Sequence, residues 1–474
     1  MGDWRNPDLD HLERHLEREL VSRGMTRAEL VAGGSRLAVA LGLGWLYQST
    51  IGGRAAFAAA DRTTGATKFT GTLKVMGMGT DLIEPVRQAA EKDLGFKLSF
   101  EVLDGATLRQ KVATQPGAFD VYSDETAGPD IIWPTGNLVP IPRSKLKYWN
   151  QYTMLYKVGR VDPKNMKATV GDGDAAFRKQ YVNGKQFVTW SDAKTGRLVP
   201  GRAEPKTVAM VGNVFNCDSF GYNSKIIKKT PEQMSWGELL NPTWKGRVAL
   251  LNDPNIGLQD AAVAAEARGM MKFRDMGNMS VKEIDGLIKI LIEYKKRGHF
   301  RAFWTSFDQS VNLMSAGEVV IESMWSPAVS VLQSQGFPCR YAAPKEGYRG
   351  WWGGNFVSKE AAKDPAKLQA AIDYMNWWHA GKAGAIMMRQ GYYSPVQQTS
   401  RRYVEPFEWG YWIDGKPASK PIPNPFGQKT AGIPVGTIRD GGSFKKRAFH
   451  YRSWNSTMDQ REHQTARWND FLAA

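Results

Sequence analysis

The chain has 474 residues, of which 42% are hydrophobic and 23% are charged, and its formal net charge is +16. This length is enough for two globular domains, and the composition excludes a disordered or fibrous protein. The basic residues are scattered, and their densest run is Lys445-Lys446-Arg447. The charge therefore indicates solubility and weak attraction of anions, and we expect no nucleic-acid partner.

The beginning of the chain has the pattern of an export signal. A charged, helix-like stretch over 8–23 precedes an apolar run over 37–46 and an alanine-rich stretch over 55–60. The apolar run is shorter than the about 20 residues of a comfortable membrane span. Residues 26–30, TRAEL, resemble a twin-arginine motif without its second arginine. We predict a cleaved export signal over 1–60, by the Sec route or a degenerate Tat route, with an uncleaved amphipathic anchor as the alternative.

The sequence has two cysteines, Cys217 and Cys339. In an oxidising compartment they could form a disulfide if the fold brings them together, and the sequence leaves that question open. Neither cysteine lies near the predicted cleavage region, so we do not expect a lipid-anchored protein.

From Gly71 onward, strand-like and helix-like segments alternate. Strands are expected over 72–76, 97–103 and 119–122, with helices over 81–94 and 106–114 between them. This alternation is typical of an α/β fold with a largely parallel sheet. In such open sheets, ligands bind at the loops that follow the carboxyl ends of the strands.

The next part of the chain combines a polar stretch with a strongly patterned segment. Residues 150–205 are polar and are expected to form a surface elaboration. The segment 235–254, SWGELLNPTWKGRVALLNDP, predicts a short helix that Asn241-Pro242 stops, followed by a turn and a strand over 248–251. The unbroken apolar run of that strand is typical of a strand covered on both faces. An acidic loop follows it directly.

Helix-start signals mark the second half of the chain. Ser280 and Glu283 form a predicted capping box, and a helix over 306–315 is expected to lead into a strand over 319–321.

Further along, Asp364 is expected to cap, and Pro365 to open, a helix that runs to Ala380. A loop rich in Pro, Gly and Trp over 408–442 and a last amphipathic helix over 454–472 complete the chain.

Signatures of catalysis are mostly missing from the sequence. The histidines lack zinc-site spacing, and neither a GxSxG nucleophile elbow nor a phosphate-binding P-loop occurs. Gly77-Met78-Gly79 partly matches a dinucleotide fingerprint, but Leu82 stands where its third glycine should be. We interpret 77–81 as a ligand loop before a helix N-terminus. The sequence therefore predicts no enzyme, no catalytic residue, no metal and no cofactor.

Several segments resemble one family. They are the run SWGELLNPTWKGRVALL, the run SAGEVVI from Ser315, Met324-Trp325, and the run PKEG before Trp351. This set resembles the solute-binding components of ABC importers, above all the spermidine/putrescine-binding proteins. The resemblance implies a two-lobed periplasmic-binding-protein fold, type II-like, with a hinge and a ligand cleft between the lobes.

The resemblance also implies an organisation and a role. Lobe 1 is expected over 69–212 and 352–395, lobe 2 over 213–351, and a C-terminal extension that packs on the lobes over 396–474. Such a protein is exported to the periplasm or the extracellular space, acts as a monomer, and closes its hinge around a small ligand that it delivers to an ABC transporter permease.

A polyamine pocket needs carboxylates for the ammonium groups and aromatic faces for the methylene chain. Asp253, Trp325 and Trp351 match family positions of this kind, whereas Ile256 and Gly353 stand where the family has carboxylates. Other acids could substitute, or the ligand could carry less charge. The predicted ligand-binding residues are Thr80, Asp81, Asp124, Glu125, Asp218, Asp253, Glu322, Trp325 and Trp351.

Neighbouring residues of a strand point to opposite faces, so at most one of Trp351 and Trp352 can face the cleft, and we expect it to be Trp351. A polyamine or another organic cation is the predicted ligand. The 17 tryptophans leave a carbohydrate as an alternative, and an exported enzyme that uses the same cleft is a second one. The sequence identifies neither the ligand nor the permease.

Overall fold

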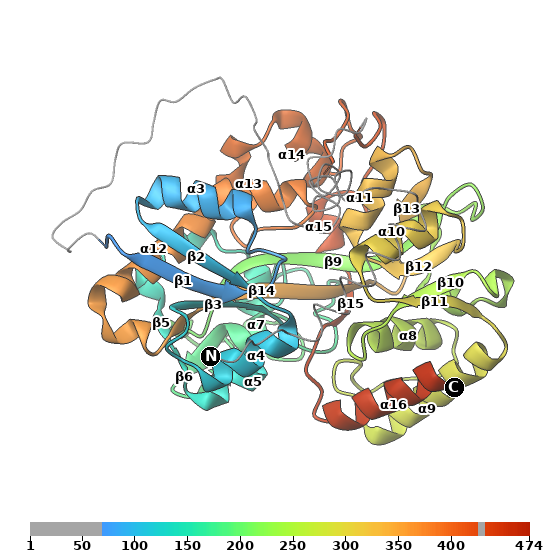
Figure 1. Ribbon diagram of the computed structural model, residues 1–474, viewed down its shortest axis with the longest axis horizontal. Helices are drawn as coiled ribbons and strands as arrows, with labels where there is room; N and C mark the ends of the chain where they lie inside the picture. The colour runs from blue at the N-terminus through green and yellow to red at the C-terminus, as the bar shows by residue number, and fades with distance from the viewer. Residues whose placement is uncertain (1–68, 425–431) are drawn as a thin grey trace, which may run out of the picture. The chain divides into compact units, whose positions relative to one another are not determined.

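The computed structural model describes residues 69–424 and 432–474 (Figure 1). The predicted export signal over 1–60 lies outside these residues, as does the part of the predicted loop over 425–431. The described chain is a mixed α/β structure built around an 11-stranded sheet.

The first part of this sheet has the predicted alternation. Strands β1 (Thr72–Gly77), β2 (Lys97–Val102) and β3 (Val121–Glu125) are parallel, with β1 between the other two. Helices α3 (Glu84–Leu94) and α4 (Gly105–Thr114) connect them. The third strand starts two residues later than the expected 119–122. It also ends three residues later and so includes Asp124 and Glu125.

Two long strands link this part of the sheet to the rest. Strands β9 (Val211–Asn223) and β14 (Tyr348–Ser358) are antiparallel to each other and buried along their whole length (Figure 1). β14 pairs with β3, whereas the second half of β9 pairs with β12 (Ile321–Met324) and β13 (Cys339–Tyr341). These two strands are therefore where the chain crosses between the two parts of the sheet.

The second part of the sheet contains β11 (Phe300–Trp304), β10 (Val248–Leu251) and β12, in that order before β9. All four residues of β10 are buried, and they alternate between two hydrophobic clusters on opposite faces of the sheet. This confirms the predicted strand and its cover on both faces. β12 starts at Ile321, so the predicted strand over 319–321 lies too early.

Local capping explains the helices of this part. Helix α9 (Val281–Lys296) begins with the predicted capping box, in which Ser280 and Glu283 bond to each other's backbone N–H groups. Helices α8 (Ile256–Ala267), α10 (Phe307–Ser315) and α11 (Ser326–Ser334) follow the ends of β10, β11 and β12. The short helix predicted in 235–254 is a 3-10 turn over Trp236–Leu240.

After β14, the chain continues into helices α12 (Pro365–His379), α13 (Lys382–Arg389) and α14 (Pro406–Trp412). The Asp364 side chain accepts hydrogen bonds from the first N–H groups of α12, as the sequence predicts. Helix α14 falls partly within the expected loop over 408–442.

The polar stretch over 150–205 contains more regular structure than expected. A small sheet has the order β5, β8, β6, β7, with the bounds Ile141–Pro142, Thr207–Val208, Tyr181–Asn183 and Gln186–Val188. Helices α6 (Met154–Val158) and α7 (Phe177–Gln180) also lie in this stretch, and β4 (Leu138–Val139) and α5 (Gly128–Ile132) precede it.

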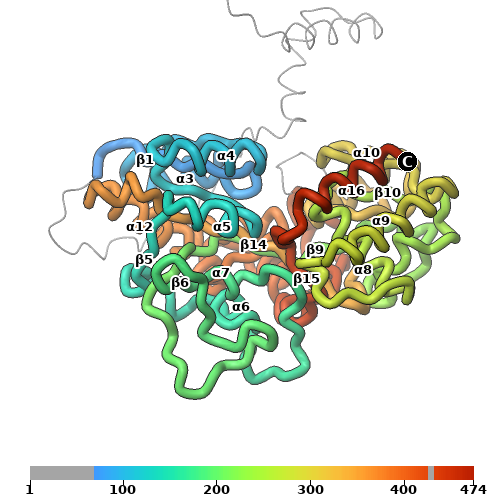
Figure 2. Tube along the Cα trace, turned by 90° about the horizontal axis from the view of Figure 1, so that it is seen from below, coloured from blue at the N-terminus to red at the C-terminus, as the bar shows by residue number. Residues whose placement is uncertain are grey.

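The C-terminal part also differs from the expectation. Strand β15 (Tyr451–Trp454) pairs in parallel with the start of β14, and α16 (Arg461–Ala473) lies against α9 (Figure 2). The predicted helix over 454–472 therefore begins seven residues too early, because Trp454 packs against Gly350 of β14 instead of opening a helix. Helix α15 (Phe444–Arg447) precedes β15.

Both cysteines are free and buried. The Cys217 thiol lies 3.1 Å from the hydroxyl oxygen of Tyr451, whereas Cys339 begins β13. The question that the sequence left open is thereby answered, because the structure contains no disulfide between these two residues.

Candidate ligand site

The loops after β1 and β3 bring three of the predicted residues together. The Thr80 hydroxyl donates to Glu125 Oε1 at 2.7 Å. Asp81 Oδ2 accepts from Ser123 Oγ at 2.5 Å and from Asn213 Nδ2 at 2.5 Å. Because β1 and β3 are neighbouring parallel strands, their carboxyl ends and the residues that follow lie at one edge of the sheet.

The two acids of this group share an unusual environment. Burial raises the pKa of Asp81 to about 7, against a lowering effect of the hydrogen bond from Ser123. Burial likewise raises the pKa of Glu125 to about 7, and the Thr80 hydroxyl offsets part of that rise. Among the described residues, no Lys, Arg or His lies within salt-bridge distance of either carboxylate. Both acids are thus held close together without a directly bonded cation.

Asp124 is neutralised within the protein. Its carboxylate receives two hydrogen bonds from Arg109, from Nε at 2.8 Å and from Nη2 at 2.9 Å, and a third from the Tyr122 hydroxyl. The Asp124 side chain is fully buried. This bidentate pair uses the charge that the prediction assigned to a ligand.

Asp218 lies on the linking strand β9, opposite Arg349 of β14. Its Oδ2 is 3.8 Å from Arg349 Nη2, while Arg349 Nε donates to Asp260 Oδ1 at 2.7 Å. Burial raises the pKa of Asp218 to about 6, and the charge of Arg349 and a hydrogen bond from Trp351 partly offset that rise. Arg349 therefore serves two acids and compensates Asp218 only in part.

An aromatic pair stands on the same face as Asp218. Trp351 is paired in register with Asn216, which lies two residues before Asp218 on β9. The Trp351 ring meets Tyr392 edge to face, with ring centroids 5.2 Å apart. Trp352 points to the other side and donates to the Asp174 carbonyl at 2.6 Å. The two neighbouring tryptophans thus have opposite orientations, as the strand geometry requires.

Tyr392 was not among the predicted residues. Burial and the nearby charges of Asp218 and Glu125 raise its pKa above the ordinary range. The pair Tyr392-Tyr393, shortly after the end of α13, is the signal in the sequence that could have pointed to it. We name the group that these interactions connect the acid–aromatic cluster. Its members are Thr80, Asp81, Glu125, Asp218, Trp351 and Tyr392.

Two further predicted residues have local partners of their own. Asp253 Oδ1 accepts from the backbone N–H groups of Asn255 at 2.8 Å and of Ile256 at 2.6 Å, and so caps the start of α8. Trp325 precedes α11 and packs edge to face on Trp304, with ring centroids 5.1 Å apart. Both side chains remain partly exposed.

Glu322 occupies a different place from the other acids. It lies on β12, on the face of the neighbouring Ala249, and its side chain is fully buried. Neither carboxylate oxygen has a hydrogen-bond partner among the described residues, although the Ser310 hydroxyl is near enough to moderate the effect of burial. Burial raises its pKa well above the usual range. Burial, and after it the nearby Glu322 carboxyl, raises the pKa of the buried Cys339 thiol.

The part of the chain that the structure describes contains no cluster of side chains that could bind a metal ion. The four histidines there bind carbonyl or carboxylate oxygens through Nε2. Within residues 69–424 and 432–474, no group of three or more His, Cys, Asp and Glu side chains could hold a metal ion.

The fold and this site define a class of two-lobed binding proteins, and comparisons with known proteins support that class. The model of the bacterial extracellular solute-binding protein family matches residues 86–409. The chain belongs to this family, which confirms the resemblance seen in the sequence. Comparison with curated proteins finds no match.

Solved structures agree on the fold. The spermidine/putrescine ABC transporter substrate-binding protein PotD of Streptococcus pneumoniae is 13% identical, with a TM-score of 0.51 over 85% of this chain and 98% of that one. An ABC transporter substrate-binding protein of Bradyrhizobium japonicum is 17% identical, with a TM-score of 0.51 over 85% and 100%. The Tp0655 lipoprotein of Treponema pallidum is 11% identical, with a TM-score of 0.50 over 84% and 99%.

The predicted fold class is thereby confirmed, and the chain is a member of the bacterial extracellular solute-binding protein family. The family that matches is one of extracellular proteins that bind solutes. No helix in the described part of the chain combines the length and the apolar character that crossing a membrane requires.

Proposed function

We propose that the protein binds an organic cation at the acid–aromatic cluster and delivers it to the permease of its ABC importer. The observation that carries this proposal is the pair Asp81 and Glu125, two carboxylates at one sheet edge without a directly bonded cation. A cationic ligand group would supply the missing charge. Trp351 and Tyr392 would face its hydrocarbon part.

Arginine side chains of the protein already pair with two of the predicted acids, and this favours a ligand with few charges. Asp124 already holds Arg109, and Asp218 is partly compensated by Arg349. Asp81 and Glu125 remain for the ligand, and burial raises both pKa values, so an ionised carboxylate is costly here without a cation. A monoamine or a diamine such as putrescine suits two such carboxylates better than a longer polyamine.

Hinge closure is the proposed mechanism of capture. We place lobe 1 at 69–212 and 352–395 and lobe 2 at 213–351, with the residues from 396 as an extension that packs on both. The linking strands β9 and β14 would then carry the motion. Because Asp218 and Trp351 sit on these strands, a ligand that binds them would shift the population toward the closed form. Asp253, Trp325, Glu322 and Asp124 stay candidate ligand contacts under this proposal.

A thermal-shift panel tests the ligand class. Putrescine, spermidine and monoamines should raise the melting temperature of the wild-type protein, because a ligand that binds only the native state stabilises it. Glu125→Gln should remove most of that rise, whereas Asp308→Asn, which removes an exposed acid of α10, should retain it. Neutral sugars form the second arm. A response to sugars and none to amines would replace the cation proposal with the carbohydrate alternative.

We also propose that the protein is exported to the periplasm or the extracellular space as a monomer, after removal of the predicted signal over 1–60. Mass spectrometry of the exported protein should show the loss of roughly the first 60 residues. An intact N-terminus in that fraction would contradict the cleavage.

A further inference from the structure

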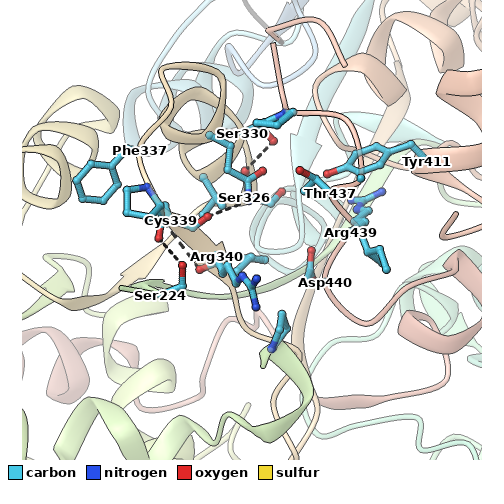
Figure 3. A pocket seen from close by; sticks show the side chains of 18 of the residues that line it. Ser224, Ser326, Ser330, Phe337, Cys339, Arg340, Tyr411, Thr437, Arg439 and Asp440 are labelled. Carbon is cyan, nitrogen blue, oxygen red and sulfur yellow. Dashed lines mark hydrogen bonds between the residues drawn. The ribbon is translucent and has the colours of Figure 1, made fainter. Parts of the chain in front are cut away.

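A cavity lies outside the acid–aromatic cluster. It has a volume of about 680 Å³ and lies between α11, β13 and the C-terminal segment 434–440 (Figure 3). No residue of the acid–aromatic cluster lines it. It is therefore a separate candidate site. Its lining includes two arginines, whereas the acid–aromatic cluster contains carboxylates.

The wall of this pocket contains a buried arginine without an acidic partner. Arg439 is 4% exposed, and it donates from Nη1 to the Trp412 carbonyl at 3.1 Å and from Nη2 to the Gly391 carbonyl at 2.5 Å. Its guanidinium lies 4.8 Å from the ring centroids of both Tyr393 and Trp412. No carboxylate in residues 69–424 and 432–474 lies within salt-bridge distance of it, and 425–431 contains no Asp or Glu.

Two other buried arginines have acidic partners: Arg349 bonds the Asp260 carboxylate, and Arg447 bonds that of Asp440. Arg160 is also buried and donates only to backbone carbonyls, but it does not line this cavity. A buried charge that contacts only neutral carbonyls and ring faces is costly, because these partners stabilise it less than an ion pair would. Arg439 is thus the buried guanidinium that lines a cavity and lacks its anion.

The rest of the wall suits an anionic group with an apolar body. The Ser326 hydroxyl accepts from Asn216 at 3.0 Å and keeps its own proton to donate, and Thr437 supplies a second hydroxyl. Arg340 adds an exposed guanidinium. The apolar and aromatic lining includes Val329, Phe337, Pro338, Tyr341, Tyr411 and Ile438.

The pocket also contains two acids, and neither cancels Arg439. Asp440 is bound by Arg447 and accepts from the Tyr348 hydroxyl at 3.0 Å. Glu232 is exposed, on a different segment of the lining. The local balance near Arg439 therefore stays positive.

We propose that this pocket binds a carboxylate carried on an aromatic or aliphatic body, with Arg439 and Arg340 as its charge partners. The site goes beyond the proposed cation binding, since it selects a ligand of opposite charge on different residues. Its apolar lining would bury the body of the ligand, and the serine and threonine hydroxyls would complete the hydrogen bonds of the carboxylate.

Titration calorimetry with benzoate tests the proposal on the full chain, with benzylamine as the cation of the same shape. Benzoate should bind the wild-type protein saturably, and benzylamine should not compete. Arg439→Gln should weaken benzoate by about tenfold or more, because a charge-assisted bond is lost. Arg340→Glu should weaken it several-fold, whereas Arg297→Glu, a charge reversal at the exposed C-terminal cap of α9, should change nothing.

Two results would overturn the proposal. One is the absence of benzoate binding to the wild-type protein at millimolar concentration. The other is equal affinity in Arg340→Glu and Arg297→Glu. If Arg439→Gln does not fold, Thr437→Trp, which fills the cavity from a partly exposed position, takes its place and should abolish binding. Glu125→Gln should retain benzoate binding, so failure here and failure of cation binding are separate results.

Discussion

At the scale of single residues, the environment decides what each carboxylate does. Among residues 69–424 and 432–474, Asp81 and Glu125 have no bonded cation, while Asp124 is paired with Arg109 and Asp253 caps a helix. Residues of one chemical type thus divide into candidates for ligand binding and residues with structural partners.

We expect the stability of the ligand-free protein to fall as pH rises toward neutrality. The folded pKa values of Asp81 and Glu125, about 7, exceed their ordinary values of 3.8 and 4.5. The stability from their protonation is fully present below the ordinary values and is lost as pH rises through about 7. Melting temperatures measured across this range should fall less in Asp81→Asn than in the wild-type protein. Parallel curves for the two proteins would contradict the assignment.

A cationic ligand should reverse this dependence. It binds the ionised carboxylates, so its affinity should increase as pH rises through about 7 and the two acids lose their protons. Titrations of putrescine at several pH values measure this directly. An affinity that falls with rising pH would contradict it.

Glu322 gives a prediction of a different kind. Its pKa is raised by burial, and its oxygens have no hydrogen-bond partner among the described residues, so folding retains a proton that the unfolded chain releases. Glu322→Gln should therefore raise the melting temperature at alkaline pH, and the gain should shrink as the solution is acidified. A loss of stability at every pH would show that the carboxyl has a partner.

The sequence could not separate Glu322 from Glu125. Both are glutamates at or near the end of a predicted strand, and a pattern of residues shows neither which face a strand covers nor what lies above it. Glu322 faces the interior beside Ala249, whereas Glu125 ends β3 beside the loop that holds Thr80. Tyr392 was missed for the same reason, because the fold alone brings it to Trp351.

At the scale of elements, the sequence predicts helices and strands correctly where the residues of one short segment determine its structure. The capping box at Ser280, the cap at Asp364 and the apolar run of β10 each contain their full signal within a few residues. Strand β15 was missed because its pairing with β14 depends on a partner about 100 residues earlier in the chain. A four-residue segment with two aromatics does not show that partner by itself.

The packing of β15 on β14 can be tested at a glycine. A Cβ added to Gly350 would lie 2.5 Å from the Trp454 ring, so Gly350→Ala should destabilise the protein by about 1 to 3 kcal/mol. Gly117→Ala is the matched control, since a Cβ there meets nothing within 4 Å. Urea unfolding of both variants measures the difference, and equal midpoints would mean that Trp454 does not pack as described.

At the scale of the whole molecule, the C-terminal segment bonds residues that are far apart in the sequence. Arg452 of β15 bonds Asp172 at 2.6 Å and Glu266 of α8 at 2.7 Å. Gln464 of α16 donates to the Pro254 carbonyl at 2.6 Å, close to the predicted acidic loop. These bonds add to the linking strands β9 and β14 as connections between distant parts of the chain.

The central claim is that the acid–aromatic cluster binds an organic cation, and calorimetric titration of putrescine at mildly alkaline pH tests it most directly. We predict saturable binding to the wild-type protein, a loss of about tenfold or more in affinity for Glu125→Gln, and no change for Asp308→Asn. Putrescine that binds all three proteins equally, or none of them, would contradict the account.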